Sequence, residues 1–222
     1  MAKATFDKER TVDCVKLLAE MYYENTGNVP RILVAVGGSA MVLRDLRSTS
    51  EDVDVFVLDE ELVQVARLLE DETGYTVDVT ANRNLWGELD IYDIEDDAEV
   101  MKNIDLAGHV VSLSAISAET LFVIKSSSLR EKDKNDLELL MPHVDPKVLM
   151  LRVATLFSRQ PDPYYAEEMV VNVIGEMQVL TGEPVHEDYF NLIPEDMRMA
   201  IMPIVEENFG AVMNASSPRV RL

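Results

Sequence analysis

The chain of 222 residues is long enough for one large domain or two small ones, and its 47% hydrophobic and 27% charged residues are typical of a globular protein. Its formal net charge of −21 disfavours a broad DNA- or RNA-binding surface, because an acidic body repels the phosphate backbone. The sequence has no apolar run long enough for a membrane span, no signal-peptide pattern and one cysteine, Cys14. We therefore expect a cytoplasmic protein in which this thiol is buried and reduced.

The first third of the chain contains five predicted elements. Apolar residues at helical spacing favour helices, whereas apolar runs and apolar alternation favour strands. The elements are a helix over residues 6–23, a buried strand over 32–36, a short helix over about 39–46, a strand over 53–58 and a helix over 60–72. This order predicts a sheet with helices packed against it.

The middle of the chain adds strands and then helices. Alternating segments at 75–80 and 88–94 are joined by a polar loop and predict a hairpin or two adjacent strands. Residues 109–114 predict one more short strand. A helix is expected after Ser117, which is a suitable N-cap, and the next helix is expected to begin near Asp133.

The last third of the chain has a helical pattern throughout. Helices are expected over 148–157, 164–180 and 194–209. We therefore predict an α/β (α+β) fold, in which a mixed sheet flanked by helices occupies residues 1–144. A helical C-terminal region with a flexible tail follows at residues 145–222.

One motif in the sheet region carries chemistry. The first predicted strand ends at a glycine turn that contains Gly38 and Ser39, and Asp52 and Asp54 begin the next strand. Strand side chains alternate between faces, so the two carboxylates project from one face about 7 Å apart along the strand. Their mutual repulsion favours a bound cation, and Mg²⁺ prefers oxygen ligands. Glycine at a helix start allows the backbone to approach a phosphate.

This arrangement resembles the core motif of the DNA polymerase β-like nucleotidyltransferase superfamily, in which Gly-Gly or Gly-Ser is followed by a spacer and Asp-x-Asp. A second segment, residues 121–140, resembles small bacterial and phage proteins related to the AbiEii abortive-infection toxins. Those proteins carry a helical lysine, a later arginine and an Arg/Lys-Asp-x-x-Asp-Leu run, which correspond here to Lys125, Arg130 and residues 132–137. The resemblance covers roughly residues 32–141. It implies a nucleotidyltransferase-type fold, a nucleoside triphosphate (NTP) substrate and Mg²⁺ or Mn²⁺.

The resemblance also implies the metal ligands. Asp52 and Asp54 would bind the metal together with a third carboxylate from a later strand. Asp90 is favoured, because apolar neighbours point it away from the core and its strand comes later in the chain. Asp78 has nearly the same local pattern and stays open.

The remaining site residues implied by the resemblance would contact the NTP. Gly38 and Ser39 would cradle the β- and γ-phosphates, and Lys125 would neutralise charge on the triphosphate. The alternative for Lys125 is a surface lysine that lies along an apolar stripe. Asp133 would hold this lysine or a substrate group.

Basic residues are concentrated in the two motif segments. Arg44 and Arg47 precede the Asp-x-Asp, and Arg130 follows Lys125. If the segments meet in the fold, they form a positive pocket that suits a small polyanion such as an NTP better than a long duplex.

Two functions from different classes follow. The first is a metal-dependent nucleotidyltransferase that acts on a tRNA end, a protein hydroxyl or a small molecule, in phage–host conflict or a toxin–antitoxin system. The second is a catalytically silent protein that keeps this fold and binds a partner through its acidic surface. The charge of −21 favours the second, and the intact Gly-Ser and Asp-x-Asp motifs favour the first.

Overall fold

The computed structural model describes residues 5–57, 60–80, 96–127, 130–210 and 212. These residues belong to two compact units, unit 1 over Met1–Ser117 and unit 2 over Ala118–Leu222. The domain boundary predicted after residue 144 would divide the chain at another position, and it stays a prediction. Of the helices described, none combines the length and the apolar character needed to cross a bilayer.

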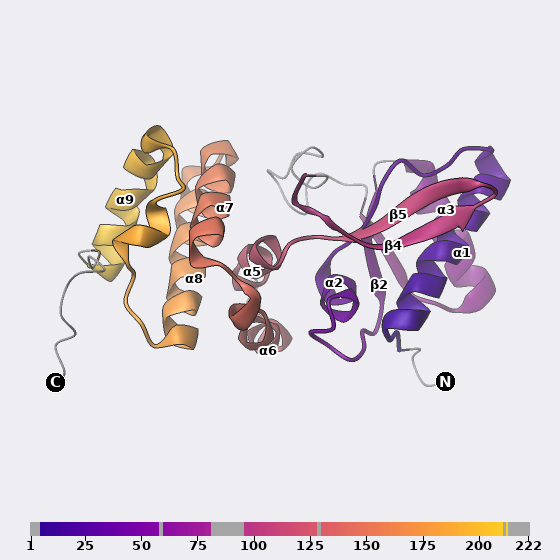
Figure 1. Cartoon of the computed structure of the whole chain (residues 1–222), viewed down its shortest axis with the longest axis horizontal. Helices are drawn as coiled ribbons and strands as arrows, with labels where there is room; N and C mark the ends of the chain where they lie inside the picture. Colours follow the sequence, from indigo (N-terminus) through magenta and orange to yellow (C-terminus); the bar gives the residue numbers. More distant parts are fainter. Residues whose placement is uncertain (1–4, 58–59, 81–95, 128–129, 211, 213–222) are drawn as a thin grey trace. The chain divides into compact units, whose positions relative to one another are not determined.

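Unit 1 is built on a mixed five-stranded sheet (Figure 1). The strands lie in the order β3-β2-β1-β5-β4. The central strand β1 pairs antiparallel with β2 and parallel with β5, while β2–β3 is parallel and β4–β5 antiparallel. The bounds are β1 Leu33–Ala35, β2 Val53–Phe56, β3 Val77–Thr80, β4 Glu99–Leu106 and β5 His109–Ala115.

Helices α1 (Lys8–Thr26), α2 (Gly37–Leu43) and α3 (Glu60–Thr73) pack around this sheet. Asp7 caps α1 by accepting a hydrogen bond from the Arg10 N–H at 2.9 Å. The apolar stripe of α1 is buried and includes Cys14, whose pKa is raised to about 12 by burial. The thiol is buried and free, as expected.

Unit 2 is helical, as predicted for the C-terminal part of the chain. Its N-caps Asp145 and Asp162 accept hydrogen bonds from the backbone N–H groups of Lys147 and Tyr164, each next to a proline in the first turn. The helices are α5 Ala118–Ser126, α6 Glu131–Leu140, α7 Pro146–Arg159, α8 Pro163–Thr181 and α9 Glu195–Phe209, with short 3-10 turns at Met141–His143 and Glu187–Phe190.

The predicted fold class is confirmed, with differences in detail. Strand β4 was not predicted, because it is an edge strand and only Ile104 and Leu106 of its eight residues are buried. Helix α2 begins at Gly37 and ends at Leu43, earlier than predicted. The predicted strand over 88–94 lies outside the described residues.

Candidate active site

The turn between β1 and α2 is shaped to receive a carboxylate. Gly37 has a left-handed backbone conformation, with φ of +50°. A Cβ atom at Gly37 would lie 2.5 Å from Oδ2 of Asp54, so a side chain here would displace the carboxylate. The Gly38 N–H donates to this same Oδ2 at 2.9 Å. The first turn of α2 and the second aspartate of the Asp-x-Asp motif are therefore in direct contact.

Ser39 ties α2 to β2. Its side chain is buried, and its hydroxyl oxygen accepts a hydrogen bond from the Asp54 N–H at 2.9 Å. The hydroxyl in turn lies 3.4 Å from the carbonyl oxygen of Asp52, to which it donates. In this arrangement the hydroxyl forms hydrogen bonds with the backbone on both sides of Val53. A contact between Ser39 and a phosphate stays a prediction.

Asp52 and Asp54 lie on one side of β2 and are half-buried, while Val53 and Val55 on the other side are fully buried. This alternation places both carboxylates at the surface of the sheet that faces away from the valines. Ser50 precedes the strand, and its hydroxyl donates to Oδ1 of Asp52 at 3.2 Å. Both carboxylates thus accept hydrogen bonds from neutral donors.

The third carboxylate has one candidate inside the described structure. Asp78 of β3 is the register partner of Asp54 in a parallel pair, so its exposed side chain lies on the same face of the sheet. Asp90 lies outside the described residues. Within the described ranges, no three acidic, histidine or cysteine side chains gather closely enough to hold a metal ion. The choice between Asp78 and Asp90 stays open.

The two arginines before the motif have different surroundings. Arg44 donates from Nε to the carbonyl of Ile116 at 2.9 Å, from Nη2 to the carbonyl of Ala115 at 3.1 Å and from Nη1 to Glu99 at 3.1 Å. Arg44 therefore anchors the segment before β2 to the end of β5, a role that the sequence did not suggest.

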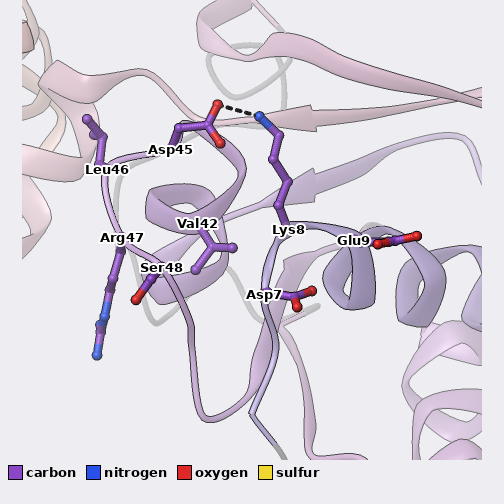
Figure 2. Close-up of a pocket in the computed structure, with 8 residues that line it drawn as sticks. All are labelled: Asp7, Lys8, Glu9, Val42, Asp45, Leu46, Arg47 and Ser48. Carbon is purple, nitrogen blue, oxygen red and sulfur yellow. Dashed lines mark hydrogen bonds and ion pairs between the residues drawn. The ribbon is translucent and has the colours of Figure 1, made fainter.

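Arg47 lines a pocket of about 450 Å³ beside the start of α1, shown in Figure 2. The ion pair between Lys8 and Asp45, 2.6 Å long, lies in the same pocket, and the Arg47 side chain points away from this pair. Among the described lining residues are neither Asp52 nor Asp54. A contact between Arg47 and an NTP stays a prediction.

Unit 2 holds a second charged cluster, made by α5 and α6. Lys125 is only 5% exposed, so it is not the surface lysine that the apolar stripe allowed. Its Nζ donates to Oδ1 of Asp133 at 3.0 Å and to Oδ2 of Asp136 at 2.6 Å, and both aspartates are buried. Arg130 Nε donates to Oδ2 of Asp133 at 2.6 Å, while its side chain stays 64% exposed. The cluster fixes α5 against α6.

Sequence reasoning missed Ser50 and Gly37. A serine two residues before an aspartate is common, and the pairing that orients Ser50 comes from Phe6, far away in the chain. The Gly-Gly pair is visible in the sequence. Only the structure shows that Gly37, the first of the two, makes room for Asp54 because it lacks a Cβ atom.

Unit 1 thus combines a mixed sheet, a glycine turn that opens a helix, and two aspartates beside that turn. The model of a family described as nucleotidyltransferases of unknown function (DUF6036) matches residues 15–173, and the chain belongs to this family. The matched region includes the Asp-x-Asp motif and the Lys125 cluster. No curated protein and no solved structure matches the chain significantly. The narrower kinship with AbiEii-related proteins stays a prediction.

Proposed function

We propose that the protein is a metal-dependent nucleotidyltransferase that transfers a nucleoside monophosphate from an NTP to an acceptor. The observation that carries this proposal is the contact between the Gly37–Gly38 turn and Asp54, with the Gly38 N–H 2.9 Å from Oδ2. This turn allows close approach of a ligand to the backbone at the point where two carboxylates face the same way.

The carboxylates suit a hard divalent cation such as Mg²⁺ or Mn²⁺, because such ions prefer oxygen ligands and keep open positions for phosphate. Asp52 and Asp54 would hold the metal, with Asp90 or Asp78 as a third ligand. A metal held by these carboxylates would supply the alignment of the attacking oxygen with the leaving pyrophosphate. The chain itself contributes the fixed separation of the two carboxylates and the short helix α2 against which Asp54 lies.

The basic residues named from the sequence have separate proposed roles. Arg47, which is half-buried in unit 1, would contact the triphosphate. For the exposed Arg130 of unit 2, such a contact stays a prediction from the sequence. Lys125 already bonds to two buried aspartates, which favours a role in holding α5 and α6 together. A contact between Lys125 and the triphosphate would require it to exchange one of these partners, and Asp133 would then position the released lysine.

The net charge of the protein bears on which chemical class of acceptor it would modify. At −21, the protein favours a cationic or neutral acceptor, such as an aminoglycoside-like small molecule or a protein hydroxyl, over a tRNA end. A role in phage–host conflict or a toxin–antitoxin system rests on the resemblance to AbiEii-related proteins.

Thermal unfolding with ATP, GTP, CTP or UTP, each with and without Mg²⁺, tests the proposal. A ligand at 100 times its Kd stabilises a protein by about 2.7 kcal/mol, which is a measurable rise in Tm. We expect one or more NTPs to raise Tm only when Mg²⁺ is present. Asp52→Ala and Asp54→Ala should lose this rise and all turnover. Asp71→Ala, which removes an exposed carboxylate on α3, should keep both.

The net charge of −21 favours a second candidate, an acidic binding protein without catalysis. In that case no nucleotide would raise Tm with or without Mg²⁺, and Asp54→Ala would behave as wild type. This result would contradict the enzyme proposal, and a search for a basic protein partner would follow.

A further inference from the structure

The segment before α1 is joined to the loop that leads into the Asp-x-Asp strand. The Phe6 N–H donates to the Ser50 carbonyl at 2.8 Å, and the Ser50 N–H donates to the Phe6 carbonyl at 2.8 Å. The Phe6 ring is fully buried and packs edge-on against Tyr75, with centroids 5.3 Å apart. The backbone of Ser50 is therefore fixed from both its donor and its acceptor side.

The side chain of Ser50 is confined as well. It is 4% exposed, and its Oγ lies where a Cβ atom on Gly38 would be only 2.5 Å away. From this position the hydroxyl donates to Oδ1 of Asp52 at 3.2 Å. The hydroxyl thus lies between the glycine turn and the first aspartate of the motif.

We propose that Ser50 is a positioning residue that orients the carboxylate of Asp52 for the metal, an inference that rests on the proposed function. Carboxylates that bind metals are commonly oriented by outer hydrogen bonds, and loss of such a bond weakens metal binding about 10- to 100-fold. A hydroxyl holds Oδ1 without bringing a positive charge that would compete with the cation. Oδ2 of Asp52 is then the oxygen that we assign to the metal.

The Phe6 pairing explains why this orientation is stable. A serine in an unpaired loop would sample several rotamers and positions, which would cost binding free energy when the metal selects one of them. Here folding fixes Ser50 through two backbone hydrogen bonds and a buried aromatic ring. Ser50 lies within the residues that the family model matches, whereas Phe6 lies ahead of them.

The test is the Mn²⁺ concentration that gives half of the maximal rise in Tm, measured with each of the four NTPs. Wild type is compared with Ser50→Ala, and Ser126→Ala is the matched control. Ser126 is 5% exposed, and its hydroxyl donates to the Phe122 carbonyl within α5. We expect Ser50→Ala to raise the half-saturating Mn²⁺ concentration at least 10-fold, and Ser126→Ala to change it less than twofold.

A second readout separates positioning from a general structural defect. At saturating Mn²⁺, Ser50→Ala should bind the NTP with the half-saturating concentration of wild type, whereas a damaged site would bind it more weakly at every Mn²⁺ concentration. An unchanged Mn²⁺ requirement in Ser50→Ala, or weaker NTP binding that saturating Mn²⁺ does not restore, would overturn this inference alone. A wild type that shows no metal-dependent rise with any NTP would overturn the proposed function, and this inference with it.

Discussion

Each unit of the chain brings two aspartates together, but the donors that meet them differ. In unit 1, Asp52 and Asp54 are half-buried and accept hydrogen bonds from the Ser50 hydroxyl and the Gly38 N–H. In unit 2, Asp133 and Asp136 are buried and both accept from the ammonium group of Lys125. Neutral donors orient a carboxylate and leave its charge to attract a cation, whereas a lysine neutralises it. The donors named here thus differ in charge: those at Asp52 and Asp54 are neutral, and the one shared by Asp133 and Asp136 is cationic.

The largest expected effect comes from removing the lysine that neutralises the two buried aspartates of unit 2. Lys125→Met would leave two buried carboxylates facing each other, and removal of one partner from a buried ion pair costs about 3–5 kcal/mol. We expect the free energy of unfolding, measured by urea titration with circular dichroism, to fall by this amount.

Lys134→Met is the matched control for Lys125→Met. Lys134 lies on α6, its side chain is 61% exposed, and its Nζ is 3.6 Å from Glu131. An exposed pair of this kind contributes about 0.5 kcal/mol or less. If both variants lost the same small amount, the Lys125 cluster would not hold α5 against α6.

A smaller effect is expected from a substitution that displaces the carboxylate of Asp54 in unit 1. Gly37→Ala would place a methyl group 2.5 Å from Oδ2 of Asp54 in a left-handed backbone conformation. The conformation alone costs about 1–2 kcal/mol, and displacement of the carboxylate adds to this. We expect a loss of about 2 kcal/mol in the free energy of unfolding, together with loss of the Mg²⁺-dependent rise in Tm.

Gly27→Ala isolates the contact from the conformation. Gly27 ends α1 with φ of +72°, and a Cβ atom there would meet nothing within 4 Å. This variant should show the conformational cost and keep the response to nucleotide and Mg²⁺. Retention of that response in Gly37→Ala would show that the glycine turn is not required for the site.

The smallest effect depends on pH and concerns unit 1 only. Burial raises the pKa of Cys14 from 9.0 to about 12, so the unfolded chain loses this proton before the folded protein does. The contribution to stability is complete below pH 9 and is lost as pH rises from 9 to 12, by about 1 kcal/mol at pH 10. Urea titrations at pH 8 and pH 10 should show a steeper loss for wild type than for Cys14→Ala. Equal losses would contradict the raised pKa.

The sequence predicted the elements whose apolar patterns are strong. The strand that ends at Gly37, the Asp-x-Asp strand and the C-terminal helices follow from local periodicity alone. Strand β4 was not predicted because its residues from Glu99 to Asn103 are mostly exposed, and an edge strand with two buried residues has no clear alternation of apolar and polar residues. The burial of Lys125 also escaped, because it depends on partners on the following helix.

The candidate site was predictable in its residue types and not in its hydrogen bonds. Asp52, Asp54 and Gly38 follow from a motif with a fixed spacing. The role of Ser50 depends on Phe6, and that of Arg44 on the carbonyls of Ala115 and Ile116. Such contacts join segments far apart in the chain, and no local pattern records them.

The hydroxyl of Ser39 has a consequence for how quickly the site can reorganise. Because it bonds to backbone on both sides of Val53, we expect α2 and the start of β2 to move as one body. The Asp54 amide should therefore exchange its proton with solvent as slowly as the amides of the central strands, although its acceptor is a side chain. A ligand would meet carboxylates whose spacing is already set, and the entropy of ordering them is lost during folding rather than during binding.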